Sequence, residues 1–389
     1  MSPRTFGIGS LVWLLSLAAV CGAHAQVADS TAAADSLLIL ELTRELGATE
    51  PAAPAPPPQA AARAAPSLNP NISLVGDFRA WYASNRARNV DAELHEAEAA
   101  LQSVVDPYAR ADVFISMGHA GDGEFDFELE EAYLTTLALP FQLQLKAGKF
   151  RSIFGKINRI HPHALPFIDT PAVYANFFGE EGLNDQGLSL SWLLPNPHFF
   201  QDLTVEVTRG PAGGEGSFAL SETNRLLYVA HLKNFWDLTE NATFELGFSG
   251  AAGPNDENRT TWLGGVDLTY KWKPLQFNTY RSLTLQAESF FSRKNRASGD
   301  VLKTWGFYAL ASWQLGRRWL VVGRYDLADL PDDPSWDEKA VSITLGFLAT
   351  EFQKIELGGR TATARGFDRD YQVLVRAVFV IGAHGAHEY

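Results

Sequence analysis

From Asn71 onward, hydrophobic and polar residues alternate with a period of two. In residues 71–82 the apolar positions are Ile72, Leu74, Gly76, Phe78, Ala80 and Tyr82. The same alternation returns in residues 260–272, 302–315 and 317–327, where aromatic residues stand near the ends of the apolar face. Since successive side chains of a strand point to opposite faces, each segment is predicted to be a β-strand with one apolar face.

Sixteen segments of this kind follow one another along the chain. They cover residues 71–82, 93–105, 107–118, 124–137, 141–151, 185–194, 200–210, 224–236, 241–252, 260–272, 279–292, 302–315, 317–327, 338–350, 352–362 and 370–389. Connections after even-numbered segments are mostly short, whereas those after odd-numbered segments are longer and polar, such as residues 211–223, 254–259, 293–300 and 328–337. Outer-membrane barrels have this asymmetry, with short periplasmic turns and longer outer loops. We therefore predict an all-β fold, a transmembrane antiparallel β-barrel of about 16 strands.

One connection differs from the others in length and chemistry. Residues 152–184, after the fifth segment, keep no strand period and contain three prolines. We predict that this segment is a pore loop that folds into the barrel and forms the channel constriction. The candidate constriction residues are Lys149, Arg151, Lys156, Arg159, His161, His163, Asp169, Glu180 and Glu181. Charged side chains at a constriction set ion selectivity, so the basic members favour anions and the acidic members oppose a purely anionic filter.

The polar faces of the predicted strands carry charges of both signs. The lumen-wall candidates are Arg79, Arg110, Asp112, Arg324 and Arg376. Opposing charges across a channel would orient polar solutes without binding them tightly. For any single one of these residues, an ordinary solvated position on the wall is the favoured interpretation.

The alternation fails at one place, in residues 125–137. The apolar face of Phe125, Phe127 and Leu129 continues to Glu131, which should not point at lipid. A β-bulge near Glu130 would restore the order, because one extra residue in a strand moves all later side chains to the opposite face.

The amino-terminal region has the pattern of an exported protein. Residues 1–25 contain Arg4, an apolar run and a small-x-small motif ending at Ala25, which predicts a secretory signal peptide. Residues 26–70 are expected to form a periplasmic segment, with one amphipathic helix and a linker rich in Pro and Ala. The barrel would then occupy residues 71–389. Signal cleavage removes Cys21, the one cysteine of the chain, so cysteine chemistry is excluded.

Two histidines of the predicted pore loop are candidate metal ligands. His161 and His163 flank Pro162, and imidazole nitrogens suit Zn²⁺. A two-histidine site needs a carboxylate or water to complete it, and the alternative is a rigid loop held by hydrogen bonds. Zn²⁺ is the one cofactor that the sequence suggests. Ser152 lies near His161 in the sequence, but no G-x-S-x-G motif is present, so catalysis is not expected.

The sequence around the pore loop resembles a known porin family. The segments EEAYLTTL (130–137), LKAGKFRSIFGKINR (145–159) and LNDQGLSLSWLLP (183–195) are similar to the phosphate-selective porin (O and P type) family. The resemblance implies a sixteen-stranded, trimeric porin with its third loop in the pore. The basic ladder of that family is not evident in this sequence, so phosphate selectivity is not implied.

Together these patterns predict an outer-membrane porin-like channel for passive diffusion of small hydrophilic solutes or ions. The alternatives are a zinc-linked outer-membrane uptake protein and a structural or adhesive barrel that its loop closes. The expected partners are outer-membrane lipid, small polar solutes, other copies of the chain in a homotrimer, and the barrel-assembly machinery, which would recognise the carboxyl-terminal aromatic Tyr389. The formal net charge of −13 argues against nucleic acid as a partner.

Overall fold

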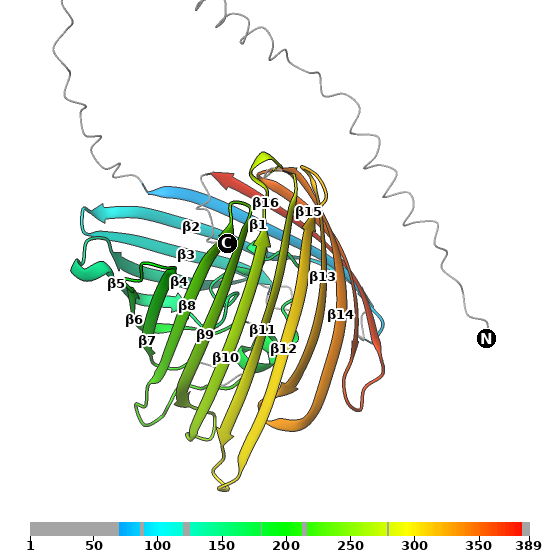
Figure 1. Cartoon of the computed structure of the whole chain (residues 1–389). Helices are drawn as coiled ribbons and strands as arrows, with labels where there is room; N and C mark the ends of the chain where they lie inside the picture. The colour runs from blue at the N-terminus through cyan, green and yellow to red at the C-terminus, as the bar shows by residue number, and fades with distance from the viewer. Residues whose placement is uncertain are drawn as a thin grey trace, which may run out of the picture. The chain divides into compact units, whose positions relative to one another are not determined.

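The computed structural model describes residues 70–85, 89–119, 125–179, 181–211, 216–277 and 280–382, which form a closed antiparallel β-barrel (Figure 1). The strands are β1 (Asn71–Ala83), β2 (Val90–Asp106), β3 (Ala109–His119), β4 (Phe125–Thr136), β5 (Leu143–Arg151), β6 (Asn184–Leu193), β7 (Phe200–Thr208), β8 (Leu227–Thr239), β9 (Ala242–Pro254), β10 (Thr260–Trp272), β11 (Ser282–Asn295), β12 (Val301–Gln314), β13 (Trp319–Leu330), β14 (Asp333–Thr350), β15 (Gln353–Thr363) and β16 (Asp370–Gly382). The predicted sixteen-stranded barrel is confirmed. The predicted signal peptide (1–25), nearly all of the segment 26–70, and the last seven residues lie outside the described part of the chain.

The barrel closes through the pairing of its first and last strands. Every strand pairs with its sequence neighbours, and β1 pairs with β16 in a register that places Asp77 opposite Val378 and Arg79 opposite Arg376. A closed ring leaves no strand edge exposed, which is the condition for a β-sheet to cross a lipid bilayer. Among the described helices, none is long and apolar enough to cross a membrane.

The bulge expected near Glu130 is present. The pairing of β3 with β4 shifts between Phe114, which faces Glu131, and Ile115, which faces Leu129. Glu130 is therefore the extra residue, and both Glu130 and Glu131 are buried inside the barrel. Leu134 is exposed on the outer side, as the restored alternation requires.

One predicted loop is wrong. Residues 328–337 were expected to connect two strands, but β13 and β14 continue to pair as far as Leu330 and Asp333. The connection is thus a tight turn at residues 331–332. The polar residues that suggested a loop belong to the ends of β13 and β14, which extend beyond the apolar stretch. Only the part of a strand within the bilayer needs an apolar outer face.

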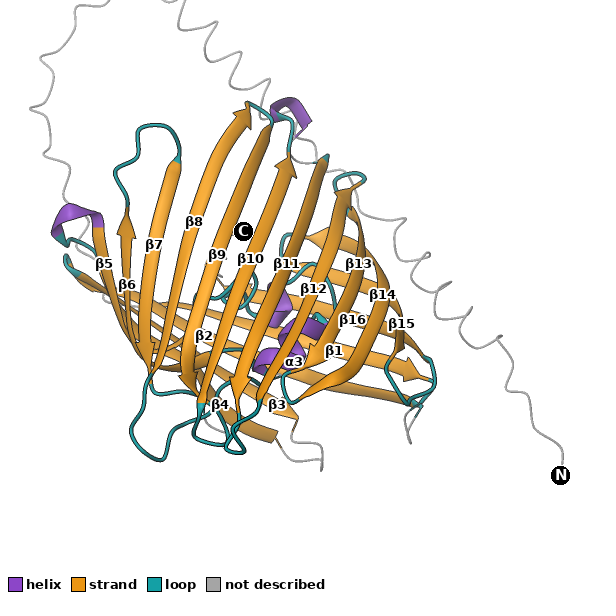
Figure 2. Cartoon of the chain, turned by 60° about the horizontal axis from the view of Figure 1, so that its bottom comes forward, coloured by secondary structure: helices purple, strands orange, loops and turns teal. Residues whose placement is uncertain are grey.

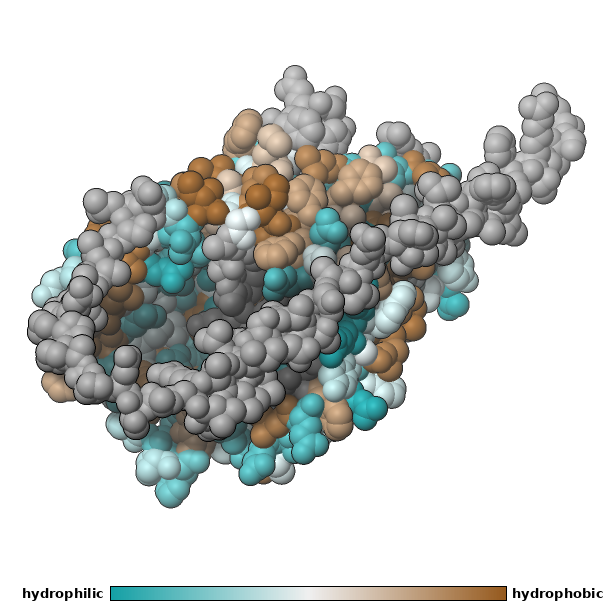
Figure 3. Space-filling model, turned by 90° about the horizontal axis from the view of Figure 1, so that it is seen from above, coloured by the Kyte–Doolittle hydropathy of each residue, from teal (hydrophilic) through white to brown (hydrophobic). Residues whose placement is uncertain are grey.

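The two faces of the barrel differ in chemistry. Large apolar side chains are exposed on the outside, among them Trp262, Val341, Ile343, Tyr371 and Ile381. Figure 3 shows apolar residues gathered along the outer side of the barrel and a hollow at the end that faces the viewer. Charged and hydroxyl side chains lie on the inner face, including buried Glu206, Asp267, Glu288 and Asp326. This is the arrangement of a transmembrane barrel with a polar interior.

The long connection between β5 and β6 lies inside the barrel (Figure 2). We call residues 152–183 the lumen loop. Its described residues, 152–179 and 181–183, contain a short 3-10 helix, η2 (Pro162–Ala164), and one α-helix, α3 (Ala172–Phe178), which contacts β12 and β13. Two further 3-10 turns, η1 (Pro140–Gln142) and η3 (Leu275–Phe277), lie in connections between strands.

Candidate functional site

One buried asparagine, Asn158, connects the two ends of the lumen loop by hydrogen bonds. The Asn158 side chain donates hydrogen bonds to the carbonyl oxygens of Ser152, at 2.7 Å, and Leu183, at 2.9 Å, and its Oδ1 accepts one from the Leu183 amide. The two ends of the loop are therefore joined beside β5 and β6. Gly155 has φ +65°, and a Cβ there would lie 2.2 Å from Glu288 Oε2, so a residue without a side chain is required at this turn.

The apolar side of the loop packs on the wall formed by β8 to β13. Residues that are distant in sequence form one buried cluster, which includes Phe154, Phe167, Tyr174, Phe177, Phe178, Phe218, Leu263, Phe290, Tyr308 and Leu310. Phe218 comes from the connection between β7 and β8, so a second connection also enters the barrel. Burial of this much apolar surface holds the loop inward and fills one side of the lumen.

The buried carboxylate of Glu288 on β11 accepts hydrogen bonds from α3 and from the lumen loop before it. The Tyr174 hydroxyl donates to Glu288 Oε2 at 2.6 Å, and the Lys156 amide donates to the same oxygen at 2.8 Å. The Tyr308 hydroxyl donates to the other oxygen. Burial and the adjacent Glu288 carboxylate raise the pKa of Tyr174 well above its usual value, so the hydroxyl stays protonated and acts as a donor.

Arginines of the far wall bind the middle of the loop. Arg324 on β13 forms an ion pair with Asp169 at 2.6 Å, and Arg360 on β15 reaches the same carboxylate at 3.3 Å. Arg376 on β16 donates to the carbonyl oxygens of Phe167, Pro162 and His163. The predicted wall residues Arg324 and Arg376 thus position the loop. They are completely or nearly completely buried.

The remaining predicted wall residues pair with neighbours on their own strands. Arg79 binds Asp77 at 2.8 Å on β1, and Arg110 binds Asp112 at 2.7 Å on β3. Because each cation is matched by an adjacent carboxylate, these pairs contribute less to a net field across the lumen than single charges would.

The basic cluster predicted from sequence is largely compensated by acidic partners. Lys149 binds Glu128 at 2.9 Å, Arg151 binds Glu130 at 3.4 Å, and Lys156 binds Glu245 at 2.5 Å. The structure therefore does not bring the four cations together as a row of free charges. Arg159, the fourth, lines a cavity described below.

The three acidic residues of the predicted constriction do not form one group. Asp169 binds the two wall arginines, and Glu180 lies outside the described residues. Glu181 accepts a hydrogen bond from Arg151 through its carbonyl oxygen, at 2.8 Å. Burial raises the pKa of the Glu181 carboxyl.

His161 and His163 turn toward the wall formed by β2 and β4. His161 Nδ1 lies 2.6 Å from Glu98 Oε2 and 3.2 Å from Glu130 Oε2, and its Nε2 lies 2.8 Å from Glu131 Oε1. Burial lowers the pKa of His161, but the hydrogen-bonded carboxylates outweigh burial and raise it well above the usual value. His163 Nδ1 lies 3.8 Å from both Glu96 and Glu98.

Two cavities lie between the lumen loop and the barrel wall, toward the ends of the strands that short turns connect. The larger, of about 490 Å³, is enclosed mainly by β2 to β7, and its charged lining includes Arg110, Lys146, Arg159, Asp112, Glu131 and Glu206. The smaller, of about 220 Å³, lies beside β8 to β12 and has Lys156, Lys271 and Glu245 in its lining. Polar space therefore remains inside the barrel next to the loop.

Several residues of the site were not among the sequence candidates. Glu96 and Glu98 on β2 alternate inward, and Lys146 on β5 lines the larger cavity. Residues 93–105 were predicted as a strand, but nothing in the sequence indicated that the histidines would lie against Glu96 and Glu98. Glu131 was visible in the sequence as a carboxylate in an apolar register.

The fold is similar to solved outer-membrane channels, and no protein-family model matches the chain. An anion-selective porin from Comamonas acidovorans has a TM-score of 0.57 and 10% identity, covering 80% of this chain and 99% of that chain. The outer membrane channel DcaP of Acinetobacter baumannii has a TM-score of 0.56 and 10% identity, covering 80% and 97%. OmpT of Vibrio cholerae in its trimer form has a TM-score of 0.54 and 7% identity, covering 80% and 100%. The fold is therefore that of a porin-like outer-membrane β-barrel.

Sequence similarity gives the family. An uncharacterized protein of Aquifex aeolicus (strain VF5) is 33% identical over 341 residues, which cover 76% of this chain and 70% of that protein. The chain belongs to the same family as this Aquifex aeolicus protein. The structural likeness supports the porin-like barrel that the resemblance to phosphate-selective porins implied. Membership of the phosphate-selective family stays a prediction.

Proposed function

We propose that the protein is an outer-membrane channel for passive diffusion of small hydrophilic solutes or ions, and that the lumen loop narrows its passage. The observation that carries the proposal is the position of the loop within a closed barrel, with a polar cavity between the loop and the β2 to β7 part of the inner wall. A sixteen-stranded barrel encloses a wide lumen unless loops occupy it. A passage narrower than that of an open barrel is the expected result.

The proposed passage follows the wall of β2 to β7. On the opposite side, the apolar cluster around Phe290 and Tyr308 excludes water. The larger cavity supplies the polar surface that hydrated solutes need, and its lining reaches Leu137 and Gln144 near the short turns. We place the entrance to this cavity on the periplasmic side, because short turns face the periplasm in such barrels.

The charges that line the larger cavity favour a weak preference for anions. Its lining contains Arg110, Lys146, Arg151, Arg159, Asp112, Glu131 and Glu206. Arg110 and Arg151 are paired with Asp112 and Glu130, so the preference depends on Lys146 and Arg159. Lys146 lies over the ring of Tyr133, 4.3 Å from the ring centre. Mixed lining charges orient a solute without binding it tightly. Selectivity would therefore be modest, and many small solutes would pass.

Planar-bilayer recording with the purified full chain tests this function. Stepwise, ohmic conductance smaller than that of an unobstructed sixteen-stranded porin is expected. In a salt gradient, the reversal potential should show a modest preference for anions. Absence of conductance at every protein concentration, with the barrel shown to be folded by its heat-modifiable migration in gels, would contradict the channel.

One observation favours a second function, that of a closed structural barrel. The buried cluster joins the loop to six wall strands, and the loop is bound at both ends and in the middle. Such packing suits a permanent plug. The bilayer experiment separates the two functions, because a closed barrel gives no steps.

The cellular setting belongs to the same proposal. The apolar exterior needs contact with lipid, and we place the barrel in the outer membrane after export by the signal peptide of residues 1–25. Assembly into a homotrimer is supported by one structural neighbour that has a trimer form. Membrane fractionation and cross-linking of intact cells test the two points. The proposed role includes no catalysis.

A further inference from the structure

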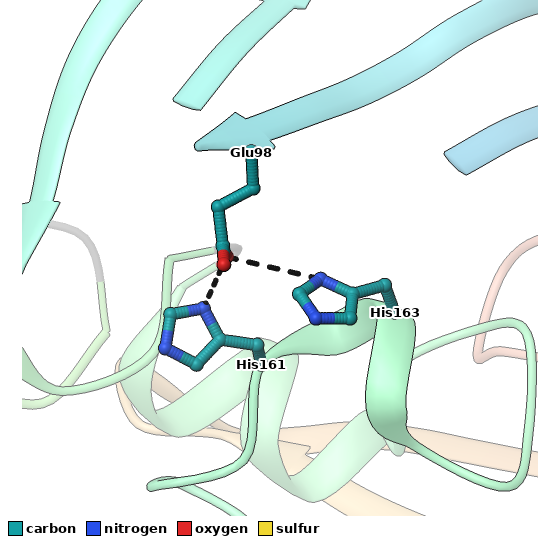
Figure 4. A group of neighbouring side chains, drawn as sticks. All are labelled: Glu98, His161 and His163. Carbon is teal, nitrogen blue, oxygen red and sulfur yellow. Dashed lines mark ion pairs between the residues drawn. The ribbon is translucent and has the colours of Figure 1, made fainter. Parts of the chain in front are cut away.

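The space between the loop histidines and strand β2 has the donor set of a metal site. Figure 4 shows Glu98 pointing from β2 toward the rings of His161 and His163, which approach it from the lumen loop. One donor atom from each residue lies within 4.8 Å of the other two. Glu98 is 0% exposed, His161 3% and His163 4%, so all three side chains are withdrawn from solvent.

Acidic charge is in excess at this place. Glu96, Glu98 and Glu130 form a second group whose oxygens lie within 4.8 Å of one another, and Glu131 adjoins it through His161. Arg151 is paired with Glu130, and Arg376 reaches Asp77 and Glu356. Four buried carboxylates, of Glu96, Glu98, Glu130 and Glu131, thus face Arg151 and the His161 imidazole, and a bound cation is one way to balance the excess of acidic groups.

Glu98 has fewer hydrogen-bond donors around it than a buried carboxylate usually has. No donor in the described part of the chain makes a well-directed hydrogen bond to either of its oxygens, although His161 Nδ1 is 2.6 Å away. Buried polar groups are normally hydrogen-bonded. A fully buried carboxylate that points at two imidazoles, and whose oxygens accept no well-directed hydrogen bond, is therefore expected to have a further partner.

The surroundings of His161 match those of a metal-bound histidine. Its Nδ1 faces Glu98, whereas its Nε2 lies 2.8 Å from Glu131 Oε1. Glu131 in turn accepts a hydrogen bond from the Arg151 amide at 3.1 Å. Metal-ligating histidines commonly donate their second ring nitrogen to a carboxylate in this way, which fixes the ring and the tautomer.

We propose that Glu98, His161 and His163 bind one divalent transition-metal ion of the Zn²⁺ type, with Glu96 or Glu130 available as a fourth ligand. Two imidazoles with carboxylates suit Zn²⁺. Ligands at ~2.0–2.2 Å from a tetrahedral Zn²⁺ are about 3.3–3.5 Å apart. The observed separations of 2.6 Å and 3.8 Å from Glu98 Oε2 bracket this value, so small side-chain rotations suffice.

The location indicates what the ion would do. Its ligands come from the lumen loop and from β2, which are more than 60 residues apart in sequence, so the ion would fasten the loop to the wall. The site is enclosed by protein, which suits a permanently bound structural ion and not a solute in transit. This role is independent of whether the barrel conducts.

Metal analysis of the full chain purified in detergent tests the inference. After EDTA treatment and desalting, the protein is given ZnCl₂, desalted again and analysed by mass spectrometry, and affinity is measured by calorimetry. The wild type should retain about one Zn²⁺ per chain. His163→Ala and Glu98→Gln remove ligands and should weaken affinity by more than ~100-fold, since outer-shell changes alone cost 10–100-fold. Glu131→Gln alters only the partner of His161 and should fall within that smaller range.

His231→Ala is the matched control. His231 is also a buried histidine of the inner wall, but it contacts Ser249 at 2.8 Å and lies outside the cluster. It should keep wild-type zinc affinity. Zn²⁺ should raise the unfolding temperature of the wild type and of this control, and not that of His163→Ala. Folding of each variant is checked by heat-modifiable migration.

Two results would overturn the site. The first is a folded wild type that retains no Zn²⁺, which would mean that His161 and Arg151 balance the carboxylates without an ion. The second is equal Zn²⁺ affinity in wild type, Glu98→Gln and His163→Ala. Neither result would decide whether the barrel conducts, because the bilayer recording tests that proposal separately.

Discussion

Arg324 on β13 and Asp169 in the lumen loop are joined by an ion pair of 2.6 Å, although 155 residues separate them in sequence. The same guanidinium binds Asp326 at 2.9 Å and donates to the Asp169 carbonyl oxygen at 2.7 Å. It also lies over the ring of Phe167. One wall residue thus fixes the turn before α3 by charge, hydrogen bonding and ring contact.

Replacing Arg324 by Ala is expected to destabilise the protein strongly. It would leave Asp326, which is fully buried, without its cation, and loss of one partner of a buried pair costs about 3–5 kcal/mol. Urea unfolding in detergent micelles measures the change. Lys339→Ala is the control, because Lys339 and Asp337 form an exposed pair, and its unfolding curve should match the wild type. Equal curves for both variants would contradict the anchoring role of Arg324.

Tyr174→Phe removes the hydrogen bond to the buried Glu288 carboxylate, together with the longer 3.4 Å contacts of the hydroxyl to Ile157 N and Phe154 O, and keeps the ring. A hydrogen bond to a charged group contributes about 1.5–3 kcal/mol, and the free energy of unfolding should fall by that amount at neutral pH. The apolar contacts of the ring with Phe290 would persist. Tyr228→Phe, at an exposed position on β8, provides the control. A Tyr174→Phe variant as stable as this control would show that the Tyr174–Glu288 contact does not hold α3.

The stability difference between wild type and Tyr174→Phe should depend on pH. The folded protein raises the pKa of Tyr174 above its unfolded value of 10.0, so it favours the protonated hydroxyl. That contribution is complete below pH 10 and is lost as pH rises toward the folded pKa. The deficit of Tyr174→Phe should therefore be constant from pH 7 to 9 and shrink above pH 10. A deficit that grows at alkaline pH would show that folding lowers the pKa of Tyr174 and does not raise it.

Charge reversal in the larger cavity should change ion preference. Lys146→Glu and Arg159→Glu each place a negative charge in its lining, and the reversal potential in a KCl gradient should shift toward cation selectivity. Lys303→Glu makes the same change on β12 beside Trp262 and Trp305 and should leave the potential unchanged. If all three variants behave alike, ions do not pass along the β2 to β7 wall.

The barrel could be predicted from sequence because its rule is local. Lipid outside and water inside impose a period of two on every strand, and an exception such as Glu131 marks a bulge. The same rule explains why the prediction of a loop at residues 328–337 is wrong. Beyond the bilayer the outer face needs no apolar residue, so the pattern stops before the strand does.

The contacts of the lumen loop could not be predicted in the same way. Tyr174 meets Glu288 across 114 residues, and His161 meets Glu98 across 63. Such pairs depend on how deeply the loop enters the barrel and which wall it meets. The sequence indicated that residues 152–184 are a loop with basic, acidic and histidine side chains. It did not show that the carboxylates of the wall compensate most of the basic ones.

The central claim is that the lumen loop lies inside the barrel and limits passage. Single-channel conductance of a variant in which residues 156–180 are replaced by a short Gly/Ser linker tests this most directly, with a variant shortened at the outer turn 296–300 as control. Both must show the heat-modifiable migration of a folded barrel. The account predicts a several-fold larger conductance for the loop variant and wild-type conductance for the control. Equal conductance in the folded loop variant and the wild type would contradict it.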